Sequence, residues 1–254
     1  MFKQLLNIIK IIKPKHILKA IRSSDHAISA FKYHYRRVTD REFADFFAKQ
    51  WGCSNDDIDQ AYKGLSNNAP CWKEIRENLS IYPGQYGLQM TMELPSLYLI
   101  VRLTQPVIVV ETGVSSGASS AYILCALHDN KKGRLYSIDL PPDNLPAGKS
   151  SGWVVPQYLR SRWSLHIGDS KELLEPSLNT IGKIDCFIHD SLHTYEHMMF
   201  EFRTAWQHLI AGGLFLSHDV GANDAFMHFM KEKGVSWTDF RVFHVLGGFI
   251  KTKP

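Results

Sequence analysis

The sequence predicts an α/β fold built on a doubly wound, mostly parallel sheet, with a helical extension in front of it. An unbroken β-branched run over 107–110 is typical of a strand that is covered on both faces. A turn of small residues follows at 112–117, and helical spacing begins near Ala118. Strand-like and helix-like segments then alternate up to residue 233, which predicts right-handed βαβ units and a parallel sheet.

Length and composition set the broad class. A chain of 254 residues can bury one core and carry an appendage. The net charge of +4 is small and spread out, and no RNP, zinc-knuckle or helix-turn-helix pattern is present, so we expect no nucleic-acid partner. The cysteines form no C-x-x-C pair, and we expect reduced core thiols in a cytoplasmic protein. They are Cys53, Cys71, Cys125 and Cys186.

The first residues form a basic amphipathic pattern over 1–22. Lys10, Lys13 and Pro14 interrupt the apolar run, so it is too short to span a bilayer, and no small-residue cleavage site follows it. The pattern fits peripheral contact with an anionic membrane. It equally fits a helix docked on its own core or on a partner in a homo-oligomer, and we favour docking.

Residues 1–80 are expected to form a helical extension, separate from a core at 81–254. The sequence leaves the role of this extension open among a lid, a docking element and an oligomerisation surface. Ser54 is the expected cap of its last helix, which ends at Gly64. The helices expected here cover 17–38, 41–51 and 55–65, followed by a turn-rich linker at 78–91.

The core elements follow in regular order after a helix over 93–103. The expected strands cover 107–111, 134–140, 163–169, 184–190 and 214–219. The expected helices cover 118–128, 171–182, 194–210 and 225–233. Gly212 and Gly213 are expected to turn into the fifth strand, and 240–252 to form a closing hairpin, which gives seven strands.

A glycine turn after the first strand predicts a ligand site. Gly113 and Gly117 lack a Cβ, so backbone amides and a helix N-terminus can approach a ligand closely. The spacing matches neither G-x-G-x-x-G nor a Walker loop. Asp139 ends the second strand, where a carboxylate can accept both hydroxyls of a ribose, as in an NAD or another adenosine ligand. Further candidates of this turn are Glu111, Thr112, Ser115 and Ser119.

Acidic and imidazole side chains follow strands four and five. Asp190 and Asp219 would face each other at the carboxyl edge of the sheet, where two carboxylates repel unless a cation or proton lies between them. We therefore expect both to bind a divalent metal such as Mg²⁺, with His193 as general base. Asp219 could instead be a simple strand-end acid. A zincin pair of His193 and His197 is disfavoured, because no Glu directly follows His193.

These motifs resemble class I S-adenosylmethionine-dependent methyltransferases, specifically the bacterial group related to macrolide-sugar O-methyltransferases. The resemblance covers about 85–254 and is carried by VP-x-x-LR-x-RW, GDS, IDCFIHDSLHTYEHM and AGGLFLSHDV. It implies that Gly168, Asp169 and Ser170 contact adenine. It implies that Asp190 and His193 provide a metal ligand and a base, and that Asp190 also borders the cofactor. His218 replaces the first acid of the family's metal pair, which leaves the metal's identity open.

The resemblance implies O-methylation of a hydroxyl on a sugar or polyketide-like small molecule. A base and a metal assist most where the acceptor is an alcohol, which hardly ionises at neutral pH. Two alternatives remain: a nicotinamide-dependent oxidoreductase, which would also use Asp139, and a cofactor-binding scaffold without catalysis. The missing G-x-G-x-x-G counts against the oxidoreductase. The acceptor itself is not identified by the sequence.

Overall fold

In a computed structural model of the chain, the described residues are 51–65, 70–80, 93–141, 145–235, 241–242 and 246–251. The chain divides into two compact units, residues 1–37 and 38–254, and every described residue belongs to the second. The segment expected at 1–22, the helices expected over 17–38 and 41–50, and most of the linker expected at 78–91 lie outside the described residues. The boundary expected at residue 80 stays a prediction.

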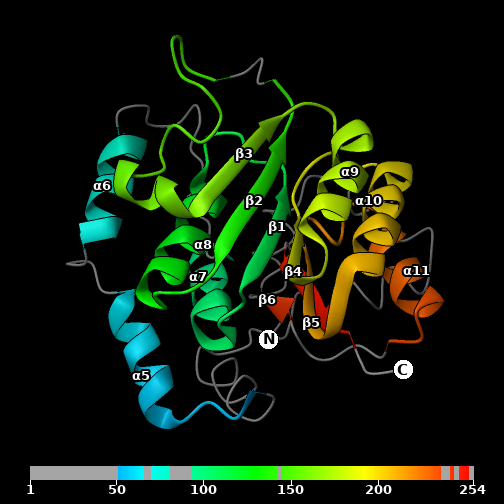
Figure 1. Cartoon of the computed structure of the whole chain (residues 1–254), viewed down its shortest axis with the longest axis horizontal. Coiled ribbons are helices and arrows are strands. Elements are labelled where there is room, and N and C mark those ends of the chain that lie inside the picture. Colours follow the sequence, from blue (N-terminus) through cyan, green and yellow to red (C-terminus); the bar gives the residue numbers. More distant parts are fainter. Residues whose placement is uncertain are drawn as a thin grey trace, which may run out of the picture. The chain divides into compact units, whose positions relative to one another are not determined.

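Seven strands form one sheet within the described part of the chain, in the order β3-β2-β1-β4-β5-β7-β6 (Figure 1). Strands β1 to β5 run parallel, and β7 is antiparallel to both β5 and β6. This arrangement confirms the doubly wound sheet and the closing hairpin. The strands are β1 Ile108–Thr112, β2 Arg134–Asp139, β3 Trp163–Ile167, β4 Ile184–His189, β5 Leu209–Ser217, β6 Arg241–Val242 and β7 Leu246–Ile250.

Helices cover both faces of the sheet. Helices α7 and α8 lie on one side of it, and α9, α10 and α11 on the other (Figure 1). They span α5 Asn55–Gly64, α6 Pro70–Ser80, α7 Glu93–Thr104, α8 Ala118–Asp129, the 3-10 helix η1 Gln157–Arg162, α9 Ser170–Ile181, α10 Tyr195–His208 and α11 Ala225–Glu232. Ser54 caps α5 as expected, because its side chain accepts from the Asp57 amide. None of the described helices is long and apolar enough to cross a bilayer.

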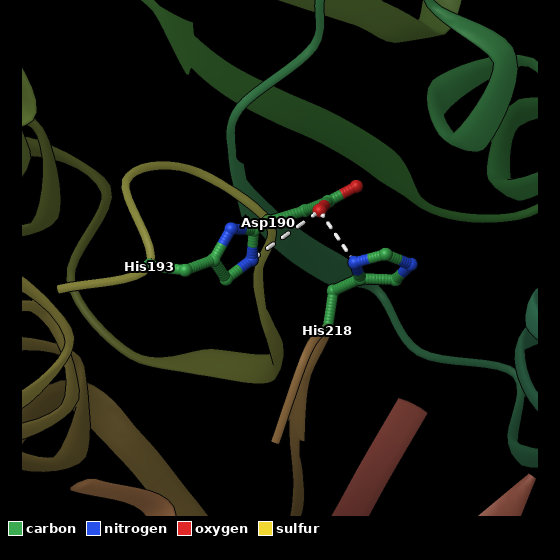
Figure 2. Close-up of side chains that lie close together, drawn as sticks. All are labelled: Asp190, His193 and His218. Carbon is green, nitrogen blue, oxygen red and sulfur yellow. Dashed lines mark ion pairs between the residues drawn. The ribbon is translucent and has the colours of Figure 1, made fainter. Parts of the chain in front are cut away.

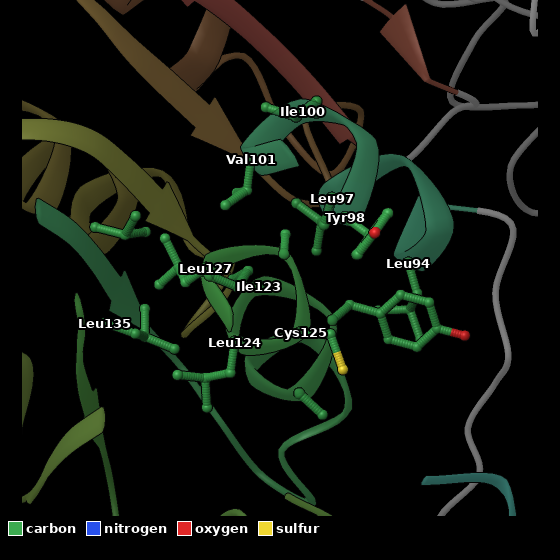
Figure 3. Close-up of a cluster of buried hydrophobic side chains, with 14 of the residues drawn as sticks. Leu94, Leu97, Tyr98, Ile100, Val101, Ile123, Leu124, Cys125, Leu127 and Leu135 are labelled. Atoms are coloured by element: carbon green, nitrogen blue, oxygen red, sulfur yellow. The ribbon is translucent and has the colours of Figure 1, made fainter. Parts of the chain in front are cut away.

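The main core lies around α8. This helix is buried on nearly its whole surface, because α7 covers one side of it and the sheet another (Figure 3). Ile123 and Leu124 of α8 are fully buried, as is Tyr98 of α7, whose hydroxyl donates to Asp129 at 2.7 Å. Ile58 of α5 and Trp72 of α6 belong to the same cluster. The helices before the sheet therefore share the core that supports it.

The start of β5 differs from the expected turn at Gly212 and Gly213. Helix α10 ends at His208 and β5 begins at once at Leu209. A register shift against β4 takes up the extra residues, and the φ of +85° at Gly212 permits it. Backbone bonds to Lys251 hold both glycines to the end of β7, at 2.7 and 2.9 Å. The expected turn is thus wrong: the pair is an irregularity inside the strand.

The expectation of four reduced thiols is wrong for two of them. Cys71 of α6 and Cys125 of α8 form a disulfide, with their Cα atoms 6.6 Å apart. Cys53 and the buried Cys186 are free. No sequence pattern marks this pair, because the partners lie 54 residues apart and only the packing of α6 on α8 brings them together.

Breaking the Cys71–Cys125 bond should lower stability. Closing a loop of 54 residues restricts the unfolded chain, which predicts a loss of about 4 kcal/mol in the free energy of unfolding for Cys71→Ala. Urea titration with and without reductant measures it, with Cys53→Ser as the control that should stay unchanged. Equal stability of wild type and Cys71→Ala under oxidising conditions would show that the bond does not form.

Candidate active site

The carboxyl ends of β1, β4 and β5 meet at one edge of the sheet. The strand order reverses between β1 and β4, which is where open α/β sheets bind their ligands. Thr112 pairs with His189 across these strands, and its carbonyl accepts from the Asp190 amide at 2.8 Å. The His218 amide in turn donates to the His189 carbonyl at 2.7 Å. The loops that carry the candidate residues are therefore fastened to one another by their backbones.

The glycine turn is packed against the chain's own backbone. Gly113 has a φ of +85°, and a Cβ there would collide with the Asp190 carbonyl. Gly117 has a φ of +90°, and a Cβ there would meet Gly152 Cα at 2.5 Å. The absence of a Cβ was expected to make room for a ligand. In the structure it makes room for the end of β4 and for the loop before η1.

Asp139 holds the glycine turn in place. Its carboxylate accepts from the Val114 and Ser115 amides at 3.1 and 3.0 Å, and from the Ser151 hydroxyl at 2.6 Å. A carboxylate offers roughly four acceptor positions, so three are used. A ribose bound here would have to share or exchange these bonds. The predicted ribose contact of Asp139 stays a prediction.

Glu111 is fully buried beside β2 and α8. Its carboxylate accepts from Ser119, Ser120 and Ser137 at 2.7, 2.6 and 2.8 Å. Burial raises the pKa of Glu111 to about 7, although the three hydroxyls oppose that shift. The side chains of Glu111 and Ser119 are thus engaged with each other, and a contact with cofactor would need these bonds to open. Their expected cofactor role stays a prediction.

The segment after β3 begins helix α9. Asp169 caps that helix by accepting from the Lys171 amide at 2.8 Å, and the Gly168 amide donates to the Asp139 carbonyl at 2.8 Å. The Ser170 hydroxyl is buried and donates to Glu201. The structure therefore places this segment beside the end of β2 and turns the Ser170 side chain inward. The expected adenine contact stays a prediction.

Asp190, His193 and His218 form a cluster in which one ligand atom of each lies within 4.8 Å of the others (Figure 2). His218 Nδ1 is 3.0 Å from Asp190 Oδ1, and His193 Nε2 is 3.8 Å from the same oxygen. Burial lowers the pKa of His193 below its ordinary value, and Asp219 and Asp190 offset only part of that effect. The imidazole is therefore neutral near pH 7, as a metal ligand or a general base must be.

Asp219 lies at the edge of this cluster. Its Oδ2 is 3.7 Å from His193 Nδ1 and 3.8 Å from His218 Nδ1, and 47% of its side chain is exposed. Its φ of +47° is a conformation that Asp tolerates better than most residues and that occurs often at functional sites. The predicted metal set contained Asp219, whereas the tightest group in the structure contains His193 instead.

The donor set fits a divalent transition metal better than Mg²⁺. Two imidazoles and one carboxylate suit Mn²⁺, Fe²⁺, Co²⁺ or Zn²⁺, while Mg²⁺ prefers oxygen ligands. The distances among the three groups allow one ion to reach all of them. Adding the Asp219 carboxylate would make the set more acceptable to Mn²⁺ or Mg²⁺.

Two residues at this edge were missed. Glu201 and His189 are not among the residues that the sequence predicts for the site. Both are fully buried, and His189 Nδ1 lies 2.6 Å from Glu201 Oε2. The sequence feature that could have identified Glu201 is its position on the apolar face of α10, next to Phe202 and one turn after His197. His197 Nε2 donates to that same carboxylate at 2.9 Å and is therefore not available as a zinc partner of His193.

Comparisons with known proteins agree with this geometry. Residues 110–220 match the sequence profile of a family described as "Methyltransferase domain". No curated protein matches the chain. The glycine turn after β1 lies inside the matched range, and the closing hairpin of β6 and β7 lies after it.

Solved structures share the fold at low identity. The O-methyltransferase TomG from Streptomyces achromogenes, in complex with SAM, has a TM-score of 0.55 at 16% identity, covering 80% of this chain and 99% of its own. The methyltransferase PaMTH1 from Podospora anserina, bound to SAH, has 0.51 at 15%, covering 80% and 97%. MycE of the mycinamycin pathway, with Mg, SAH and mycinamycin VI, has 0.51 at 18%, covering 81% of this chain and 62% of its own. Identities this low support the fold and no more.

Substituting Gly113 should lower the free energy of unfolding far more than substituting a glycine that has the same φ but no neighbouring atoms. Gly113 and Gly212 share a φ of +85°, but nothing lies within 4 Å of a Cβ on Gly212. We expect Gly212→Ala to lose about 1 kcal/mol through backbone strain. Gly113→Ala adds the collision with the Asp190 carbonyl and should lose about 3 kcal/mol or more. Equal losses in urea titration would mean that the two strand ends are not in contact.

Glu111 should make stability depend on pH. Its pKa is about 7 in the folded protein against an ordinary 4.5, so its contribution is complete below pH 4.5 and is lost as the pH rises through 7. Relative to Glu111→Gln, the wild type should therefore lose about 3 kcal/mol between pH 4.5 and 7.5, at about 1.4 kcal/mol per pKa unit.

Urea titrations at the two pH values test this, with the exposed Glu172→Gln as control. Parallel pH profiles for wild type and Glu111→Gln would contradict the raised pKa. The control should follow the wild type.

Proposed function

We propose that the chain, whose residues 110–220 match a methyltransferase-domain profile, is a class I, S-adenosylmethionine-dependent enzyme that methylates a hydroxyl oxygen of a small molecule. The observation that carries the proposal is the Asp190–His193–His218 cluster, which lies at the strand edge beside the glycine turn of β1. A methyl group delivered at this edge would reach an acceptor held against the cluster.

The transfer moves a methyl group from a sulfonium to an oxygen, and the acceptor loses a proton. The methyl is already electrophilic, so alignment of the acceptor supplies much of the rate, of the order of 7 to 11 kcal/mol. An alcohol hardly ionises at neutral pH and therefore benefits most from a base. We assign that role to His193, whose lowered pKa keeps it ready to take the proton.

We assign Asp190, Asp219 and His218 to a divalent metal. When bound, the ion supplies Lewis-acid chemistry that eases loss of the acceptor proton. His193 has two options, because its Nε2 faces Asp190 and its Nδ1 faces Asp219. If His193→Ala loses metal binding along with turnover, His193 belongs to the ligands and not to proton transfer.

We further propose a sugar or polyketide-like acceptor. The sequence resemblance to the macrolide-sugar group supports this, as does the likeness in fold to proteins named for the mycinamycin and tomaymycin pathways. Leu192 and Tyr195 stand on either side of His193 and Thr194, with 54% and 37% of their surface exposed. Exposed apolar side chains beside a base fit an acceptor whose hydroxyl lies next to an apolar face.

The first test is calorimetric titration of S-adenosylmethionine in EDTA, followed by Mn²⁺, Mg²⁺ or Zn²⁺. We expect cofactor binding without metal and a loss of at least about tenfold, or 1.4 kcal/mol, in Asp139→Ala. His218→Ala should lose the metal signal and keep the cofactor, while the exposed His166→Ala should change neither. No binding of S-adenosylmethionine under any condition would reject the proposal and reopen a nicotinamide cofactor.

Turnover is then measured as a mass gain of one methyl group on a panel of hydroxylated macrolides and glycosides. His193→Ala should lower kcat by about 10² to 10⁴ with unchanged cofactor affinity. Cofactor binding without methylation of any panel member, in the presence of metal, would favour the scaffold without catalysis.

A further inference from the structure

A fully buried carboxylate, Glu201 of α10, lies directly beneath the candidate site. Both of its oxygens accept hydrogen bonds from side chains far apart in the sequence. Oε2 contacts Thr112 Oγ1 at 2.6 Å and His189 Nδ1 at 2.6 Å; Oε1 contacts His197 Nε2 at 2.9 Å, Ser191 Oγ at 2.9 Å and the Ser170 hydroxyl. An acid without contact with water is costly to bury unless donors surround it, and here five do.

Glu201 is ionised in the folded protein. Burial alone would raise the pKa of this carboxyl group, but hydrogen bonds from His189 and His197 outweigh that effect and hold the pKa below its usual range. Hydrogen bonds to a charged acceptor are short and directional. The donors around Glu201 are therefore held in fixed orientations.

The partners of Glu201 come from the loops that carry the predicted site. Thr112 directly precedes Gly113, and Ser170 is the last residue of the segment expected at adenine. His189 and Ser191 flank Asp190 on both sides. One carboxylate thus anchors the ends of β1 and β4 and the start of α9.

His189 connects this anchor to the Asp190–His193–His218 cluster. Its Nδ1 is bound to Glu201, which fixes the tautomer and the plane of the ring. That ring packs edge-on against His193, with 5.3 Å between centroids and 83° between planes. The His189 carbonyl also accepts from the His218 amide at 2.7 Å. His189 therefore contacts two of the three cluster members while its own orientation depends on Glu201.

We propose that Glu201 is a positioning residue which, through the His189 ring, holds His193 where it joins Asp190 and His218 as a third metal ligand, the second of the two options given above for His193. The inference rests on the proposed function, since it concerns the metal site assigned there. Glu201 itself does not touch the metal, the cofactor or the acceptor. Loss of the direct partner of a ligating histidine typically costs 10- to 100-fold in metal affinity; Glu201 acts one contact further out, so we expect the lower end of that range, about tenfold.

His197 provides a matched control. Like His189, it is a buried histidine on the same carboxylate, but its contacts are to Ser170, Glu201 and Phe200 and not to the cluster. His189→Phe and His197→Phe each replace one ring by another and each remove one bond to Glu201. If metal affinity fell only because Glu201 had lost one of its hydrogen bonds, the fall would be similar in both variants.

The experiment titrates Mn²⁺ alone into wild type, Glu201→Gln, His189→Phe and His197→Phe, and in parallel S-adenosylmethionine in EDTA. We expect Mn²⁺ affinity to fall about tenfold in Glu201→Gln and His189→Phe and less than threefold in His197→Phe. Cofactor affinity should change less than threefold in all of them. A purely structural role would lower the melting temperature and both affinities together.

Each outcome is decisive. Unchanged Mn²⁺ affinity in folded Glu201→Gln, or equal losses in the two histidine variants, overturns the positioning role and leaves the proposed function standing. Absence of Mn²⁺ binding in the wild type overturns both the metal assignment and this inference, while cofactor binding still tests the methyltransferase proposal separately. If Glu201→Gln does not fold, the two histidine variants decide the question between them.

Discussion

Two buried carboxylates on opposite faces of the sheet determine how the strand ends are arranged. Successive residues of a strand point to opposite faces, so Glu111 of β1 points toward α8 and Thr112 toward α10. On the first side Glu111 is satisfied by three serine hydroxyls, and on the second Thr112 is one of five donors to Glu201. Since neither acid can reach water, every donor around it has to stay in place, and the loops that carry these donors stay with them.

The sequence was enough to predict the sheet because its strands are apolar and are separated by helices of regular spacing. It also placed Asp139, Asp190 and His218 at one edge, because parallel strands end on the same side. The sequence could not predict which side chains form hydrogen bonds or disulfides with one another. The five donors to Glu201 come from distant segments, and so do the two cysteines of α6 and α8, so only the packed structure brings them together. The irregular start of β5 depends likewise on pairing with β7.

The fold does not determine the acceptor, because sheets of this kind support many reactions and the loops provide the specificity. What distinguishes this chain is the chemistry of its strand-four and strand-five loops. His218 occupies a position where the resembling family has an acid, and it faces Asp190 at 3.0 Å. The exposed Leu192 lies one residue before His193. These features place an imidazole-rich cluster beside exposed apolar side chains, and in the proposed function this combination selects the acceptor.

The contacts of Asp139 have a consequence for how a cofactor is received. Its carboxylate already fixes the Val114 and Ser115 amides, and the Ser115 carbonyl accepts from Gly152 at 2.8 Å. The turn therefore has its final shape before any ligand arrives. Little chain entropy remains to be lost when a ligand binds, so affinity is governed by the exchange of one set of hydrogen bonds for another. If Asp139 binds a ribose as proposed, the site would discriminate by the number and direction of a ligand's hydroxyl groups and not by folding around it.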